Sequence, residues 1–361
     1  MSSMNGDDDA VFDVTVKIQK ERIRLKLLDR DDVPVVERRL IQADGVVVTV
    51  AMPVHDVGQL QRFVDTDPYR AELQGHLATL VQRYVARVES GAGVTTGRKA
   101  RRDPRPSLKR RQKGGDELGL FGRLDALATA RSEGQLYARV HALLEQFEIP
   151  VEQFIFAGFR LTGESRVPAA YRYFGACDPQ WLQLYMQRRW YMIDPFYSWA
   201  MAGSSPMPGS QLVLHTSGQR DFYARLQASG FDSCLVAPAR MAQGKLFGVF
   251  IAGNAMPTEA GERALLRYRQ VFRALAAELL DWSAKNLARK AIAALGLTDR
   301  EIAVLNLLAR GQAAPEIAME LGVSANRVYK EFYPELTFKM QVDHISKALA
   351  MALELGMVFS L

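Results

Sequence analysis

Residues 297–332 read LTDREIAVLNLLARGQAAPEIAMELGVSANRVYKEF, and this stretch carries the start and stop signals of consecutive short helices. Thr298 can accept a hydrogen bond from the backbone N–H of Glu301 while the Glu301 carboxylate reaches back to Thr298, an arrangement that starts a helix. Apolar residues follow at helical spacing, and Gly311 suits the position just past a helix end. The pattern predicts a helix between Thr298 and Gly311.

Two further helices are predicted in the same stretch. Pro315 fits the first turn of the second helix, where its missing N–H is not needed, and Gly322 turns the chain. Ser324 suits the N-cap of a third helix that begins near Ala325. A fourth helix is expected over residues 344–355. This order predicts a helix-turn-helix, in which the third helix is the element that enters a DNA major groove.

The segment resembles the C-terminal DNA-binding domain of LuxR-type bacterial transcription factors. The residues that meet the family's pattern are Leu297-Thr298, Arg300-Glu301, Val304-Leu305, Gly311, Glu316-Ile317-Ala318, Leu321 to Ser324 and Val328. The resemblance implies DNA contacts by Ser324, Asn326, Arg327, Lys330 and Lys339. A four-helix packing module without a DNA role is the alternative.

Upstream, apolar and β-branched runs alternate with helical patterns. We expect strands at 153–161, 171–176, 232–241 and 245–254, and helices at 178–190 and 221–228. This order predicts an α/β/α sandwich around an antiparallel sheet. One long helix is expected over 258–295. It has two candidate roles: packing across a symmetric partner, as in homodimers that read palindromic DNA sites, and packing within the chain.

Trp181, Tyr185 and Asp194-Pro195 stand at the spacing W-x3-Y-x8-D-P. This spacing resembles the acyl-homoserine-lactone sensor domain of quorum-sensing regulators. The resemblance implies that Trp181 donates its indole N–H to a lactone carbonyl and that Asp194 accepts from the ligand's amide N–H. The alternative from the residues alone is a core stripe of Trp181 and Tyr185 and an N-cap role for Asp194.

Several positions depart from the sensor family's pattern. A family tyrosine falls at Cys177, the second pocket tryptophan at Gly209, a glycine at Cys234 and a small polar residue at Phe250. Each change removes a head-group partner or alters the volume of the pocket, so we expect a small acyl signal, either an acyl-homoserine lactone or a non-standard ligand. The predicted ligand-binding residues are Trp181, Tyr185, Asp194, Tyr173, Cys177 and Phe250.

The predicted third helix of the helix-turn-helix is irregular. Pro334 removes a backbone hydrogen bond and clashes with the carbonyl four residues back, at a cost of about 3 kcal/mol, so we expect a kink or an early end near Tyr333. Over residues 296–361 six basic residues oppose eight acidic ones, a net charge of minus two, whereas DNA affinity rests on basic residues. The second hypothesis is therefore a degenerate LuxR-like protein that does not read DNA and acts by pairing with or sequestering another regulator.

The chain's net charge of +6 comes from one stretch. Residues 98–113 hold nine basic residues and one acidic residue, a net charge of +8. The surrounding residues 90–116 are rich in Gly and Pro and poor in apolar residues, which predicts a flexible basic linker. Two roles for it remain open: a solvated tether, and an auxiliary arm on DNA phosphates.

The residues before this linker predict a small α+β domain of unknown role. Strands are expected at 12–18, 23–27 and 46–52, and helices at 34–42 and 68–88. Partner docking or dimerisation is a hypothesis for this part.

The expected order is a disordered start at 1–10, the N-terminal domain at 11–89, the linker at 90–116, the sensor at 117–285 and the helix-turn-helix domain at 286–361. The expected fold class is α+β multidomain: a small N-terminal α+β domain, a central α/β/α sandwich with an antiparallel sheet and a C-terminal all-α four-helix domain.

Composition fits a regulator. The 361 residues are 48% hydrophobic, enough for sizeable cores. The start lacks a secretory signal and no apolar run is long enough to span a membrane, so we expect a cytoplasmic protein without a membrane partner. Cys177 and Cys234 are expected to be reduced and buried. The histidines show no metal-ligand spacing and no catalytic constellation stands out, so we expect no metal, no cofactor and no enzymatic activity.

Overall fold

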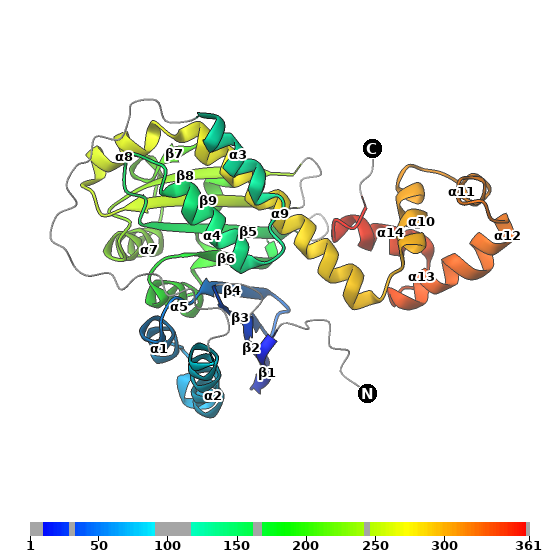
Figure 1. The fold of residues 1–361 in the computed structure, drawn as a ribbon, viewed down its shortest axis with the longest axis horizontal. Helices are drawn as coiled ribbons and strands as arrows, with labels where there is room; N and C mark the ends of the chain where they lie inside the picture. Colours follow the sequence, from blue (N-terminus) through cyan, green and yellow to red (C-terminus); the bar gives the residue numbers. More distant parts are fainter. Residues whose placement is uncertain (1–9, 29–32, 91–116, 162–167, 242–245, 359–361) are drawn as a thin grey trace. The chain divides into compact units, whose positions relative to one another are not determined.

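The computed structural model describes residues 10–28, 33–90, 117–161, 168–241 and 246–358 (Figure 1). They belong to two compact units, one ending at residue 280 and the other beginning at residue 281. Except for Ala10 and Ser90, the predicted disordered start and the predicted linker lie outside the described residues.

The first unit is built on one sheet, which has nine strands in the described part of the chain. They are β1 (Ala10–Ile18), β2 (Glu21–Leu28), β3 (Val35–Ile41), β4 (Val47–Pro53), β5 (Gln153–Leu161), β6 (Pro168–Ala176), β7 (Met207–Pro208), β8 (Ser233–Arg240) and β9 (Leu246–Asn254). The strand order is β1-β2-β3-β4-β6-β5-β9-β8-β7, and neighbouring strands are antiparallel except β4 and β6, which run parallel. The predicted N-terminal domain and the predicted sensor thus share one sheet.

Strand β3 corrects one expectation, because residues 34–42 are not helical. Pro34 is a helix-start signal, but Val35 and Val36 are β-branched and favour a strand. The strand pairs with β2 on one side and β4 on the other, and it is mostly buried on both faces. Such a strand lacks the apolar and polar alternation by which strands are found in a sequence.

Two helices cover the N-terminal strands, α1 (Val57–Asp65) and α2 (Arg70–Glu89). The second confirms the helix predicted over 68–88, whereas α1 was not predicted. Both helices bury apolar side chains against β2, β3 and β4, among them Leu60, Phe63, Leu73 and Leu77. The N-terminal segment therefore has a hydrophobic core of its own in addition to its place in the common sheet.

Helices cover both faces of the sensor part of the sheet, which confirms the predicted sandwich. One face carries α5 (Pro179–Gln187), α6 (Pro195–Ala202), α7 (Ser217–Ala228) and the short turns η1 (Trp190–Met192) and η2 (Gly209–Gln211). The other carries α3 (Glu117–Leu127), α4 (Glu133–Leu144) and the start of α9 (Arg269–Leu295) (Figure 1). On this face the ring of Phe272 stacks on that of Phe250. The single helix predicted over 258–295 is divided into α8 (Thr258–Leu266) and α9 by a turn at Arg267 and Tyr268.

The second unit contains helices throughout its described part. They are the end of α9, then α10 (Asp299–Ala309), α11 (Ala314–Leu321), α12 (Ala325–Arg327), the π-helical turn η3 (Val328–Phe332), α13 (Tyr333–Lys339) and α14 (Ile345–Glu354). Thr298 and Glu301 form the predicted capping box, Pro315 lies in the first turn of α11, and Ser324 caps α12. Gly322 adopts the left-handed conformation that ends α11, with φ of 64°. Across the described segments of both units, no helix has the length and hydropathy needed to cross a bilayer.

Of the kink or early end expected near Tyr333, the early end is not found, because the helix continues past Tyr333 after an irregular turn. After the wide turn η3, in which the Tyr333 N–H bonds to the Val328 carbonyl five residues back, the chain continues as α13. A wide turn shifts the preceding carbonyls relative to the ring of Pro334 and relieves the clash. It also keeps Val328, Phe332 and Leu336 on one buried face at a spacing of four residues, which exceeds the 3.6 residues of an α-helical turn.

Candidate functional site

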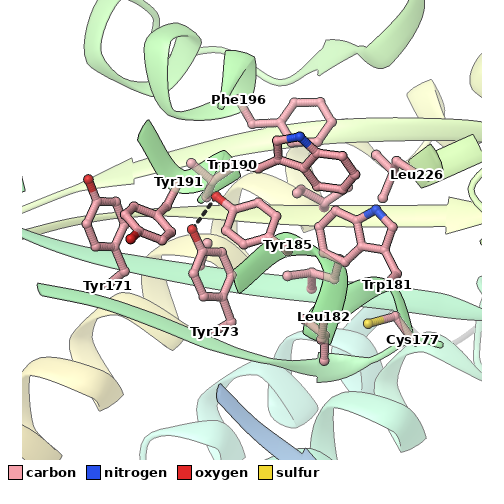
Figure 2. Packing of buried hydrophobic residues seen from close by; sticks show 14 of the residues in the cluster. Tyr171, Tyr173, Cys177, Trp181, Leu182, Tyr185, Trp190, Tyr191, Phe196 and Leu226 are labelled. Atoms are coloured by element: carbon pink, nitrogen blue, oxygen red, sulfur yellow. Dashed lines mark hydrogen bonds between the residues drawn. The ribbon is translucent and has the colours of Figure 1, made fainter. Parts of the chain in front are cut away.

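Aromatic side chains from α5 and β6 pack together on one face of the sensor sheet (Figure 2). Trp181 and Tyr185 lie one turn apart on α5, with ring centroids 5.2 Å apart. Tyr173 reaches them from β6, and its ring centroid lies 4.6 Å from that of Tyr185. Cys177 follows β6 and lies in the same buried cluster. The structure thus brings these four predicted ligand-binding residues together. We call the whole buried cluster that contains them the aromatic cluster; it also includes Val48, Val50, Trp190, Val249 and Ile251.

Asp194 joins the aromatic cluster through hydrogen bonds. The Tyr173 hydroxyl donates to the Tyr185 hydroxyl, which in turn donates to Asp194 Oδ2 at 2.7 Å. Asp194 Oδ1 accepts from the backbone N–H groups of Phe196 at 2.8 Å and Tyr197 at 3.3 Å. Asp194 is therefore the N-cap of α6, and the same carboxylate borders the cluster.

The ionisable groups of the cluster have shifted pKa values. Burial raises the pKa of Asp194 to about 6, and the hydrogen bonds from Tyr185 and the backbone oppose that rise. Burial, together with the nearby Asp194 charge, raises the pKa of Tyr173 and Tyr185 well above the ordinary value. Near neutral pH the site therefore combines an ionised carboxylate with neutral phenols, and an ionised carboxylate is a strong acceptor for an amide N–H.

Trp181 presents a donor to this site. Its indole N–H is buried and has no hydrogen-bond partner in the described part of the chain. A buried donor without an acceptor costs about 1–3 kcal/mol, and a bound acceptor would remove that cost. A donor from Trp181 and an acceptor at Asp194, both in contact with Tyr185, suit a ligand head group that carries a carbonyl and an N–H.

Gly209 and Cys234, two departures from the family's pattern, lie next to each other in the structure. A Cβ built on Gly209 would lie 2.3 Å from Cys234 Sγ and 2.8 Å from the Tyr223 hydroxyl oxygen. Cys234 therefore fills space that a larger residue at position 209 would need. Burial raises the pKa of the Cys234 thiol to about 12, so this thiol stays protonated and packs as a small apolar group. The two changes compensate each other in volume.

Phe250 is not part of the aromatic cluster, so its inclusion among the predicted ligand-binding residues is corrected here. Its neighbours on β9, Val249 and Ile251, point into the cluster. Phe250 points to the opposite face, where its ring stacks on those of Phe154 and Phe272. Because side chains alternate along a strand, a displacement of one residue in matching the family's pattern moves a residue to the wrong face.

The predicted DNA-contact residues at the start of the third helix are exposed. Asn326 and Lys330 lie on the surface, and the exposed Ser324 accepts from the Arg327 N–H at 3.2 Å as the helix cap. Arg327 Nε pairs with Glu331 Oε2 at 2.7 Å. An ion pair so exposed contributes little free energy, so Arg327 can exchange this partner for a phosphate or a base.

Lys339 has a different environment from the other predicted DNA-contact residues. Its Nζ lies 2.7 Å from Glu301 Oε2 and donates to the Gly296 carbonyl at 2.9 Å. Glu301 is buried and belongs to the capping box that starts α10. Lys339 thus joins α13 to α10 within the unit, and we no longer count it as a DNA contact.

Other residues with a bearing on the sites were not found from the sequence. Tyr329 is 56% exposed, Phe338 84% and Met319 79%, so the second unit presents large apolar side chains at its surface. Val48 and Val50 from the N-terminal segment lie in the aromatic cluster. A helical wheel drawn with the wide turn could have found Tyr329, but no local pattern identifies the distant strand that completes a cluster.

Two family models match the chain. Residues 132–281 match the autoinducer binding domain, and residues 295–352 match the bacterial regulatory proteins of the luxR family. Their order is that of a sensor followed by a helix-turn-helix. The chain is a LuxR-type quorum-sensing regulator. It is a DNA-binding transcriptional regulator that responds to a ligand.

The solved structures to which the chain is similar include SdiA and CepR2. SdiA in complex with octanoyl-rac-glycerol has 15% identity and a TM-score of 0.45, with coverage of 68% of this regulator and 97% of that chain. Escherichia coli SdiA in another crystal has 15% identity and a TM-score of 0.44, with coverage of 67% and 98%. CepR2 from Burkholderia cenocepacia, an N-acylhomoserine lactone dependent LuxR family transcription factor, has 17% identity and a TM-score of 0.39, with coverage of 48% and 97%. A comparison with curated proteins finds no match.

Proposed function

We propose that the regulator binds a small acylated signal at the aromatic cluster. The observation that carries this proposal is the buried Trp181 N–H without a partner, in the same cluster as the ionised Asp194. A carbonyl of the ligand would accept from Trp181, and an amide N–H would donate to Asp194. The surrounding aromatic and aliphatic side chains would hold an acyl chain.

The head group of this signal need not be a homoserine lactone. Tyr185 already donates to Asp194, and Cys234 fills the space next to Gly209. Both features reduce the room and the polar partners available to a head group, and a site selects ligands by the polar partners it offers. An acyl ligand with a different carbonyl-bearing head group is therefore the non-standard candidate.

Two ligands that share an octanoyl chain but differ in their head group test the proposal. We expect N-octanoyl-homoserine lactone or 1-octanoyl-glycerol to raise the unfolding temperature, since a ligand that binds only the folded state stabilises it. Trp181→Phe should weaken calorimetric binding of the better probe about tenfold, the effect of losing one buried hydrogen bond.

Trp190→Phe is the matched control, because Trp190 is an equally buried indole of the same cluster that is not among the side chains lacking a partner. Its effect on binding should be smaller than that of Trp181→Phe. Equal losses in both variants, or no stabilisation by either octanoyl compound, would contradict the proposed site.

We also propose how the regulator meets DNA. Asn326 and Lys330 would reach base edges and phosphates from the third helix, with Arg327 released from Glu331. The DNA site would be palindromic and the protein a homodimer, since two-fold sites are read by two-fold dimers. The regulator would act in the cytoplasm, where bacterial DNA lies. Absence of sequence-dependent DNA binding would instead favour a protein that pairs with or sequesters another regulator.

A further inference from the structure

Strand β4 of the N-terminal segment lies directly beside β6, the strand that carries Tyr173. The two strands pair in parallel, with Val48 opposite Tyr171 and Val50 opposite Tyr173. Val48 and Val50 are fully buried within the aromatic cluster. One wall of the proposed signal site therefore comes from a segment more than a hundred residues away in the sequence.

Gln42 extends this link from the turn between β3 and β4. Its Nε2 donates to the hydroxyl of Tyr191 on η1. The ring centroid of Tyr191 lies 4.6 Å from that of Tyr171 and 6.5 Å from that of Tyr185. The Gln42 backbone is itself held, because its N–H donates to the Val46 carbonyl at 2.9 Å. A fixed turn of the N-terminal segment thus holds a ring that packs against the residue donating to Asp194.

Arg38 makes a second link, to α5. It is fully buried, and its Nε donates to Asp67 Oδ2 at 2.8 Å. Its Nη1 lies 3.4 Å from the sulfur of Met186 on α5, and its guanidinium carbon lies 5.4 Å from the centroid of the Tyr69 ring. A buried charge is tolerated only with its partners in place. The pair therefore favours a single arrangement of β3, the α1–α2 turn and α5.

We infer that the N-terminal segment is part of the signal sensor, and that Gln42 and Arg38 are positioning residues for α5 and η1. Helix α5 presents Trp181 and Tyr185, so its placement decides the distances between donor, acceptor and acyl wall. The inference rests on the proposed signal site. It gives the segment a role inside the sensor, in place of the partner docking or dimerisation considered from the sequence.

Gln42→Leu tests this role, because it removes the donor to Tyr191 at similar volume. We expect the Kd for the better octanoyl probe to rise about fivefold, the range for one lost hydrogen bond. We also expect amide hydrogen exchange over residues 179–192 to quicken in the ligand-free protein. The control is Leu77→Val, which trims the core made only by the N-terminal segment. It should lower the unfolding temperature and leave both readouts unchanged.

The two readouts separate this inference from the proposed function. If neither octanoyl probe binds the wild-type protein, the proposed ligand is wrong, and exchange over residues 179–192 still decides the inference. Unchanged exchange in Gln42→Leu, or equal changes in Leu77→Val, would overturn it. Should Gln42→Leu not fold, the paired variant Arg38→Met with Asp67→Asn removes both buried charges at once. Quickened exchange over 179–192 in that variant would support the inference, and wild-type exchange there would overturn it.

Discussion

Asp194 serves as a helix cap and as the carboxylate of the proposed signal site, and its burial has a consequence for stability. Its pKa rises from the ordinary 3.8 to about 6 because burial disfavours the charged form. The folded state therefore binds a proton more readily than the unfolded state between these two pKa values. As pH rises from about 4 through about 6, the folded protein loses on the order of 2–3 kcal/mol of stability from this group.

The variant Asp194→Asn isolates this effect, since an amide oxygen can still cap α6. We expect the difference in free energy of unfolding between Asp194→Asn and wild type to change by about 2 kcal/mol between about pH 4 and pH 7.5, in favour of the variant at the higher pH. Tyr173 and Tyr185 keep their protons over this range. Denaturant unfolding of both proteins at several pH values measures the difference, and a difference that does not vary with pH would refute the assigned shift.

At the scale of single residues, local spacing predicted part of the site. Trp181 and Tyr185 share a helix face because they stand four residues apart, and Asp194 before Pro195 is a helix-start signal, so these positions follow from local rules. The environments of Phe250 and Lys339 could not be predicted from such local rules. The first depends on strand register, and the second on an ion pair with Glu301, 38 residues earlier. Neither is encoded by nearby sequence.

At the scale of elements, the wide turn η3 changes what Pro334 costs. A proline inside a regular helix costs about 3 kcal/mol relative to alanine. Here Pro334 lies in the first turn of α13, directly after η3, and the buried residues Val328, Phe332 and Leu336 favour the wide turn independently of it. We therefore expect Pro334→Ala to stabilise the unit by less than about 1 kcal/mol.

Amide hydrogen exchange of α13 in the full chain measures this change. The exposed neighbour Glu335 provides the control, because Glu335→Ala alters helix propensity at the surface without a change in backbone hydrogen bonding. A gain near 3 kcal/mol in Pro334→Ala alone would mean that the wide turn is imposed by the proline and not by the buried stripe.

Elements with strong ends and the strands β5, β8 and β9 were predicted well, whereas the buried strand β3 was not. Caps and turns place α10, α11 and α14 within a few residues of their expected bounds, because each cap is a contact between residues close in sequence. Strand β3 was misread because its pairing with β2 and β4 outweighs the helix-start signal at Pro34. Tertiary pairing of this kind overrides local propensity.

At the scale of the whole molecule, the sequence predicted the order of the parts but not their junctions. The two family patterns could be found because each is carried by residues close together in the chain. The pairing of β4 with β6 could not be found from the sequence, because nothing in Val47–Pro53 specifies the strand edge with which this segment pairs. The N-terminal segment was therefore expected to form a separate domain, although its strands extend the sensor sheet.

Charge is distributed unevenly along the chain. Residues 296–361 have a net charge of minus two, whereas residues 98–113 carry +8. DNA binding needs basic residues that displace counterions from phosphates, and each phosphate contact adds about 0.9 to the slope of log K against log salt. Since residues 296–361 are net negative, we expect the basic stretch to supply phosphate contacts. Replacing its nine Lys and Arg residues with Ser should reduce the slope by about 3 or more, whereas Lys330→Ala should reduce it by about 1. Fluorescence anisotropy with labelled DNA over a range of KCl concentrations gives both slopes. If the Ser variant keeps the wild-type slope, residues 98–113 act as a tether and the phosphate contacts must come from the helix-turn-helix unit alone.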